Sequence, residues 1–203
     1  DIKEGNQGRY SESDVQKYRD QTDPLNFPNN DWQKLVLKEF APQQHHNLSL
    51  NGGNEQIKYY ASLGYFNQGT LYKFNTNWLK RYNYRLSLTG DFAKIGLKTS
   101  MTIYGVDETR RDNASGYGSG YFAVWSHIQN APPFDKAYAD LEQTKYANKG
   151  DHPIVEIDPR SGYVRNQDRN LNALLNFDWK VPGVEGLSFR ANGNLSQVQA
   201  FGK

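Results

Sequence analysis

Histidines are the first residues of this sequence that could support metal binding or acid–base chemistry. The chain has four of them, His45, His46, His127 and His152. His45 and His46 are adjacent, and neighbouring residues of a strand point to opposite faces, so this pair cannot hold one ion together. His127 and His152 stand far from the pair and from each other in the sequence. We therefore expect no metal site and interpret the adjacent histidines as the entrance to a strand.

Carboxylates could act in pairs, as the acid and base of a glycoside hydrolase do. Two groups fit that description, Asp107 with Glu108, and Asp151 with Glu156 and Asp158. Both groups lie in segments with many unrelated charges, and nothing in the sequence raises the pKa of one carboxyl above that of its neighbour. We interpret them as solvated loop charges.

Two glycine-containing segments resemble ligand-binding loops only in part. Residues 112–116 begin like a calcium-binding loop but lack its later bidentate glutamate. Residues 116–121 contain a Gly-x-Gly spacing that follows no apolar strand leading into a helix, so they do not fit a nucleotide-binding turn. The chain has no cysteine, which removes disulfides and thiolate nucleophiles. We expect no enzyme, and no bound cofactor or metal.

The composition excludes further classes of protein. Aromatic residues make up 14% of the 203 residues, far more than in a disordered chain. The 24 Lys and Arg nearly balance the 22 Asp and Glu, so the basic footprint of a nucleic-acid binder is missing. No apolar run approaches the roughly 20 residues of a membrane helix. The chain starts at Asp1 without a signal segment, and we expect a processed or excised piece of a longer protein.

Six segments alternate apolar and polar residues, the period-two pattern of a strand with two different faces. They lie at 46–51, 55–66, 81–92, 95–105, 170–179 and 187–197. In the last five, one set of alternate positions holds mostly Leu, Ile, Tyr and Phe with no charge. The other set holds mainly Asn, Ser, Thr, Gly and Arg with no Glu. The pattern predicts an all-β fold.

The links between these segments alternate between short and long. The short links are 52–54, 92–94 and 181–185, and the long ones are 67–80 and 107–169. Strands joined by tight links must be antiparallel neighbours, so the pattern predicts an up-and-down meander with every long loop at one end. Short helices are expected within the loops, at 11–19 after a capping box and at 121–128 before two prolines.

Two folds give this alternation, a soluble β-sandwich and a transmembrane β-barrel. The polar face lacks glutamate, aromatic residues gather at both ends of the apolar face, and the long loops share one end. These features favour the barrel. The alternative is a soluble carbohydrate-binding β-sandwich module, which would fold without detergent.

Several motifs resemble one family in order and in spacing. They are Asp31-Trp32, the segment 46–53 (HNLSLNGG), the segment 58–69 (KYYASLGYFNQG) and the segment 81–85 (RYNYR). The series resembles the first third of the barrel of SusC/RagA-type TonB-dependent transporters. The resemblance implies a 22-stranded barrel in the outer membrane of Bacteroides-type Gram-negative bacteria. It further implies a plug domain, a SusD-like surface lipoprotein as lid, the TonB system as energy source, and oligosaccharides or peptides as cargo.

The resemblance divides the chain into four parts. We expect an extracellular loop region at 1–45, about four barrel strands at 46–105, a long extracellular loop at 106–169 and about two strands at 170–203. Set against that resemblance, we expect this chain to lack the plug domain and the TonB box.

Two sets of residues are candidates for contact with cargo or partners. Rings in the long loop could stack on a sugar or a peptide side chain, or could instead pack the loop onto its neighbours or onto the lid; they are Tyr117, Tyr121, Phe122 and Trp125. Cations on the polar face would line the lumen and contact the plug or the substrate; they are Arg81, Arg85, Lys98 and Arg190.

Overall fold

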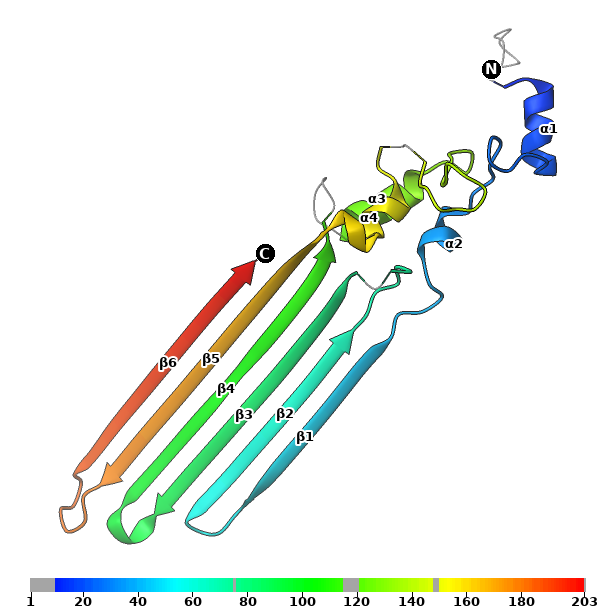
Figure 1. The fold of residues 1–203 in the computed structure, drawn as a ribbon. Helices are drawn as coiled ribbons and strands as arrows, with labels where there is room; N and C mark the ends of the chain where they lie inside the picture. The colour runs from blue at the N-terminus through cyan, green and yellow to red at the C-terminus, as the bar shows by residue number, and fades with distance from the viewer. Residues whose placement is uncertain (1–9, 75, 115–120, 148–149, 203) are drawn as a thin grey trace, which may run out of the picture. The chain divides into compact units, whose positions relative to one another are not determined.

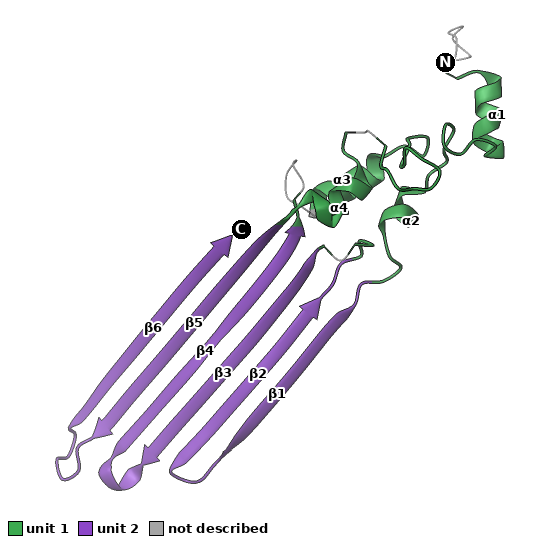
Figure 2. Cartoon of the chain, in the orientation of Figure 1, with its two compact units in different colours: residues 1–40, 71–76, 113–163 green, residues 41–70, 77–112, 164–203 purple. Residues whose placement is uncertain are grey.

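The computed structural model describes residues 10–74, 76–114, 121–147 and 150–202. The chain divides into two compact units (Figure 2). Unit 1 comprises residues 1–40, 71–76 and 113–163, and unit 2 comprises residues 41–70, 77–112 and 164–203. Each unit is assembled from segments that are far apart in the sequence.

Unit 2 is a single antiparallel meander of six strands in the order β1-β2-β3-β4-β5-β6 (Figure 1). The strands are β1 (Gln43–Gly53), β2 (Ile57–Gln68), β3 (Trp78–Phe92), β4 (Leu97–Asn113), β5 (Tyr163–Lys180) and β6 (Ser188–Gly202). Tight turns join β1 to β2, β3 to β4 and β5 to β6. The turn before β4 is a 3-10 helix, η2 (Ala93–Ile95), which ends at Gly96 in the left-handed conformation. The all-β meander predicted from the sequence is confirmed.

The strand register places the apolar residues on one face, because residues paired across neighbouring antiparallel strands share a face. Leu63 pairs with Tyr84 and Leu86 pairs with Ile103. In the last two strands, Ala173 pairs with Leu195. The intervening residues, among them Ser62 opposite Arg85, form the polar face. The alternation in the sequence therefore corresponds to two faces of one sheet.

The apolar face is not covered by a second layer of strands. Within the described ranges there is one sheet, and none of the buried hydrophobic residues belongs to its strands. Leu48 keeps 73% of its surface exposed and Leu195 keeps 62%. A soluble sandwich would bury this face against a second sheet, so the sandwich alternative does not describe this fold.

Strands β4 and β5 run further toward the long loops than the alternation indicated. The pairing of β3 with β4 continues through Arg81 opposite Glu108 and Leu79 opposite Arg110. Residues 106–113 and 163–169, which we expected in the long loop, are therefore strand residues. The alternation stops earlier than the strands do, because the apolar face ends at Asp107. Beyond that residue the strands stay paired, but most residues on this face are no longer apolar.

Unit 1 contains the helices and a small hydrophobic core. Its elements are α1 (Glu12–Asp20), α2 (Trp32–Val36), α3 (Tyr121–Asn130), α4 (Pro153–Ile157) and the 3-10 helix η3 (Pro159–Ser161). The predicted capping box starts α1, where Ser11 and Asp14 each accept a hydrogen bond from the other's backbone N–H. Both predicted helices are present, α1 and α3. No helix in the described part of the chain is long and apolar enough to cross a membrane.

The core of unit 1 joins segments from three loops. Its buried members are Trp32, Val36, Tyr72, Val124, Ile128, Ala137, Ile154 and Ile157. The stretch around Tyr72 is held beside α2 by backbone hydrogen bonds, from Lys38 N–H to Leu71 and from Lys73 N–H to Val36. Burial of such side chains is the main favourable term in folding in water, so this unit has a hydrophobic core of its own.

Candidate functional site

The apolar face of the sheet forms a band whose height can be derived from the strands. On β3 it extends from Tyr82 to Phe92, which at about 3.4 Å per residue is about 34 Å along the strand. A strand tilt of about 45° reduces this to about 24 Å, close to the roughly 25 Å apolar band of outer-membrane barrels. The band therefore has the dimension required to face the hydrocarbon of such a membrane.

Aromatic rings border the band at both ends. Toward the loops, the Tyr65 ring lies 5.1 Å from that of Tyr82 and stacks on His46 at 6.3 Å. Toward the short turns, Trp179 stacks on Phe189 at 5.9 Å and donates its indole N–H to the Ile95 carbonyl at 3.0 Å. Tyr and Trp rings with a satisfied polar end are typical of the membrane–water interface.

A charged group marks the loop-side limit of the band. Asp107 lies opposite Tyr82, on the apolar face. Its carboxylate accepts hydrogen bonds from Arg169 Nε at 2.9 Å and from Gln167 Nε2 at 3.0 Å. An ion pair facing hydrocarbon would be costly, so this pair indicates where the headgroup region begins.

Three of the four cations that we expected on the polar face pair with carboxylates of the sheet itself. Lys98 Nζ lies 2.9 Å from Asp91. Arg190 donates two hydrogen bonds to Asp178, at 2.9 and 3.1 Å. Arg81 lies 3.8 Å from Glu108, and its guanidinium sits over the Phe66 ring at 5.3 Å. These cations are partly neutralised within the wall.

Arg85 is different from the other three. Its Nε donates to Ser87 Oγ at 3.4 Å, and it makes no ion pair with any residue that the structure describes. Its partners in the register are Ser62 and Tyr104. The polar face therefore presents one guanidinium whose charge is unmatched within the described sheet.

The four loop aromatics do not form one surface in the described structure. Phe122 is 72% exposed, whereas Trp125 packs against the core of unit 1. Tyr121 is the first residue of α3, and Tyr117 lies outside the described residues. Contact with cargo or lid stays a prediction, and Phe122 is the ring whose exposure allows it.

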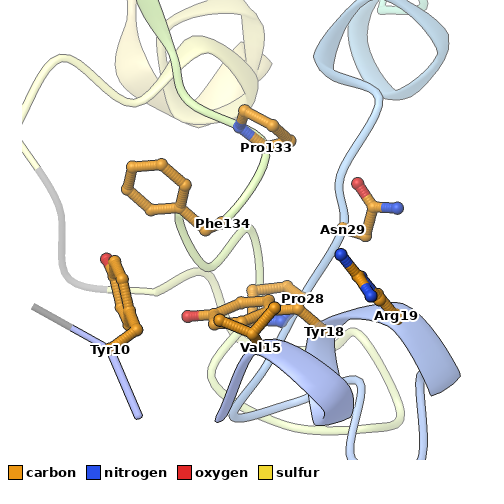
Figure 3. A pocket seen from close by; sticks show the side chains of 8 residues that line it. All are labelled: Tyr10, Val15, Tyr18, Arg19, Pro28, Asn29, Pro133 and Phe134. Atoms are coloured by element: carbon orange, nitrogen blue, oxygen red, sulfur yellow. The ribbon is translucent and has the colours of Figure 1, made fainter. Parts of the chain in front are cut away.

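A pocket in unit 1 was not anticipated from the sequence (Figure 3). It has a volume of about 360 Å³ and its lining includes the rings of Tyr10, Tyr18 and Phe134. Its remaining lining residues are Val15, Arg19, Pro28, Asn29 and Pro133. Residues from the start of the chain meet a turn more than 100 positions later, and no spacing in the sequence signals such a meeting.

The fold also brings His127 close to two carboxylates, those of Glu156 and Asp151. The sequence did not indicate that these three residues meet. Its Nδ1 lies 2.6 Å from Glu156 Oε1, and its Nε2 lies 3.9 Å from Asp151 Oδ1. Ligand atoms of the three residues lie within 4.8 Å of one another, close enough to hold a metal ion. Burial raises the pKa of Glu156, although its hydrogen bond to His127 opposes that shift. The shortest contact in this group joins α3 to α4 directly.

Asp158 stabilises the fold of unit 1 through its hydrogen bonds. Its carboxylate accepts hydrogen bonds from Arg160 Nε at 2.9 Å and Nη2 at 2.6 Å, and from the Tyr146 hydroxyl at 2.7 Å. The Arg160 hydrogen bonds hold the pKa of this carboxyl well below its usual range. A carboxylate that is ionised and surrounded by donors stabilises a fold and is poorly suited to donate a proton.

Known proteins resemble this chain in sequence and in structure. No protein-family model matches the chain. A TonB-dependent receptor P26 of Formosa agariphila is 34% identical over 100 residues, which cover 48% of this chain and 9% of that protein. A chain of the RagAB peptide importer in its "closed-closed" state aligns over 86% of this chain and 19% of its own length, with a TM-score of 0.56 and 21% identity. A structure titled as the RagAB peptide transporter aligns equally widely, with a TM-score of 0.55 and 22% identity.

The six-stranded sheet with one apolar and one polar face has the fold of a segment of a chain of the RagAB importer. Together with the receptor match, this agrees with the resemblance to SusC/RagA-type transporters that the sequence motifs indicated. It spans about a tenth of the curated relative and about a fifth of the solved chain.

Proposed function

We propose that this chain supplies part of the barrel wall and the outer loops of a TonB-dependent importer in the outer membrane of a Bacteroides-type Gram-negative bacterium. The cargo is an oligosaccharide or a peptide, and a SusD-like surface lipoprotein closes over the loops. No bond is made or broken by this part of the protein, because its role is to form a wall, a lumen surface and an outer vestibule.

The single observation that carries the proposal is the sheet with one apolar face and one polar face in a single layer. Leu48 and Leu195 stand exposed on one side, and cations such as Arg85 stand on the other. In water such a sheet would expose a large apolar patch, which monomeric soluble proteins avoid. In a barrel the apolar face of the same sheet contacts lipid on the outside, and its polar face contacts water in the lumen.

The two surfaces suggest separate roles in import. The polar face lines the lumen, where the unmatched guanidinium of Arg85 is placed to meet a carboxylate of the plug. In this proposal the long links between strands are extracellular, and Phe122, in one of them, contacts the cargo or the lid. Energy delivered through TonB from the periplasmic side would then release the cargo past the plug.

Surface labelling tests the proposed topology. Single cysteines would replace Phe122 in α3 and Lys94 in the η2 turn of a cysteine-free full-length protein. A membrane-impermeant maleimide applied to intact cells should label position 122 and spare position 94. Opening the outer membrane should expose position 94 as well. Labelling of position 94 alone in intact cells would contradict the proposed orientation.

Uptake tests the proposed activity. Cells that carry the full-length protein should accumulate labelled cargo from pools of peptides and of oligosaccharides, and accumulation should fall to background when TonB is inactivated. Loss of the partner lipoprotein should have a similar effect. Uptake that persists without TonB would contradict energy-coupled import.

A further inference from the structure

The pocket in unit 1 is built from two walls that several contacts hold together. One wall is α1 with the segment after it, and the other is the turn at 132–136. Asn30 donates its backbone N–H to Pro133 and its side-chain amide to Asp135, both at 2.7 Å. Trp32 donates its indole N–H to Pro132 at 2.9 Å. The pocket therefore has walls that are fixed relative to each other within unit 1.

The interior of the pocket is mainly aromatic and apolar. The Tyr10 ring lies 5.8 Å from Tyr18 in an edge-to-face arrangement and 6.1 Å from Phe134. Both Tyr10 and Phe134 remain about 40% exposed, at 39% and 43%. The volume of about 360 Å³ is near the lower limit for ligand sites. Such a space suits one bulky apolar side chain with a short length of attached backbone.

One side of this apolar pocket carries a cation. Arg19 lies beside Asn29 and across the pocket from Tyr10 and Phe134 (Figure 3). The guanidinium of Arg19 makes no ion pair or hydrogen bond with any described residue, whereas the nearby Lys17 ammonium lies 3.9 Å from Asp14 and over the Phe27 ring at 4.6 Å. A guanidinium presents a planar fork of donors that matches a carboxylate. The pocket therefore combines an apolar space with a cation, Arg19, that can bind a carboxylate of a ligand.

This combination indicates what the ligand must contain. A sugar ring would bring several hydroxyl groups that each need a partner, and beyond the tyrosine hydroxyls the lining offers mainly Arg19 and Asn29. A hydrophobic amino-acid side chain next to a free α-carboxylate needs only an apolar space and one cation. The charge complementarity and the lining favour the latter.

We propose that this pocket binds the C-terminal residue of a peptide, with an aromatic or other bulky apolar side chain among Tyr10, Tyr18 and Phe134 and its α-carboxylate on Arg19. The proposal rests on the proposed import function and assigns the outer loops a preference for one end of a peptide cargo. It assigns the first selection of cargo to unit 1.

Calorimetric titration of the full-length protein in detergent tests the pocket. The probes are the tripeptide Ala-Ala-Phe, its C-terminal amide, Ala-Ala-Ala and glucuronic acid. Ala-Ala-Phe should bind about tenfold or more tightly than its amide, because charge-assisted hydrogen bonds contribute about 1.5–3 kcal/mol. In Arg19→Gln this ratio should fall to about one, and Arg19→Lys should retain part of it. Phe134→Ala should reduce the preference for Ala-Ala-Phe over Ala-Ala-Ala.

Lys94→Gln is the matched control, since it removes an exposed cation in the η2 turn and should leave the ratios unchanged. An acid-to-amide ratio that stays the same in Arg19→Gln would overturn the proposal, and so would absence of peptide binding. Binding of glucuronic acid that depends on Arg19, without peptide binding, would overturn it in favour of an acidic sugar. Cysteine labelling separates the pocket proposal from the import proposal. The expected labelling without a preference for the carboxylate would refute the pocket alone. The opposite labelling with an acid-to-amide ratio that depends on Arg19 would refute the import proposal alone.

Discussion

The two units of this chain use the same kinds of apolar side chain in opposite ways. In the sheet of unit 2, Leu48 and Leu195 keep most of their surface exposed. In unit 1, Val36, Tyr72 and Ile157 are completely buried. The sheet is stable only where something other than water covers its apolar face, whereas unit 1 has its own interior. Apolar residues therefore have to be interpreted together with their periodicity before they are assigned to a core.

The sources of stability differ accordingly. The sheet is held by strand pairing along five neighbouring strand pairs, and β1 and β6 form its two edges. Open edges invite pairing with other strands, which a closed barrel would provide. Unit 1 is held by a buried cluster and by specific polar contacts such as those of Asp158. Substitutions should therefore have different consequences in the two units.

The largest difference is expected for truncation of an apolar side chain. Ile157→Ala leaves a cavity in the core of unit 1 and should reduce its stability by about 2–5 kcal/mol. Leu195→Ala on the exposed face removes a side chain that lipid can replace, and should cost much less. Native-state hydrogen exchange of α4 and of β6 in the full-length protein measures both effects. Equal losses would contradict the contrast between the units.

Charge on the sheet should distinguish its two faces. Leu88→Arg and Met101→Arg each place a guanidinium in the middle of the apolar band, where outer-membrane barrels lose roughly 2–4 kcal/mol. Ser87→Arg and Ser100→Arg are the matched controls, since each lies one residue away on the polar face, and should cost much less. Refolding of the full-length protein into bilayers under denaturant gives the four free energies. A larger loss for the serine variants would reverse the assignment of the faces.

Asp158 should be the most sensitive polar residue in unit 1. Asp158→Asn weakens the hydrogen bonds with Arg160 and Tyr146 in a buried setting and should cost about 1–3 kcal/mol. Because the pKa of Asp158 is lowered in the folded state, its contribution is present above its ordinary pKa and is lost as the pH falls below it. Thermal unfolding of unit 1 at neutral and acid pH measures this. Asp151→Asn, at an exposed carboxylate, should change the midpoint little, and a similar shift for both would weaken the argument.

The smallest effect concerns Glu156. Burial raises the pKa of its carboxyl in the folded state, so its contribution to stability is complete below its ordinary pKa and is lost as the pH rises through the raised value. The charge of Asp151 also raises the pKa of this carboxyl, whereas the short hydrogen bond of His127 lowers it. Glu156→Gln should flatten the pH dependence of unit 1 just above pH 4.5. An unchanged profile in that variant would assign the dependence to another group.

The strands could be predicted from the sequence because alternation is local and repeats several times in each strand. Tyr82, Tyr84, Leu86 and Leu88 alternate with Arg81, Asn83, Arg85 and Ser87, and a helix cannot imitate that pattern. The strand ends could not be predicted, because pairing continues past Asp107 while the apolar pattern has stopped. Hydrogen bonding defines a strand, and the apolar pattern reports only the part that faces lipid.

Unit 1 could be predicted only in its local pieces. The capping box at Ser11 and the proline stop after α3 are local signals and gave two helices. The core could not be predicted, since Val36, Tyr72 and Ile157 come from three loops with no shared periodicity. The same reason hid the pocket around Arg19 and Phe134 and the contact of His127 with Glu156. Meetings between distant segments depend on the whole fold.

The most direct test of the central claim is the environment of consecutive positions on β3. Spin labels would be attached at single cysteines from Asn83 to Thr89 in the full-length protein in bilayers, using the absence of cysteine in this chain. Collision with oxygen, which concentrates in lipid, should be greatest at positions 84, 86 and 88, and collision with a water-soluble nickel chelate should be greatest at 83, 85, 87 and 89. The same two-residue period with opposite phase for the two reagents is the result that we expect. Nickel maxima at 84, 86 and 88, or no alternation at all, would contradict a lipid-facing apolar surface.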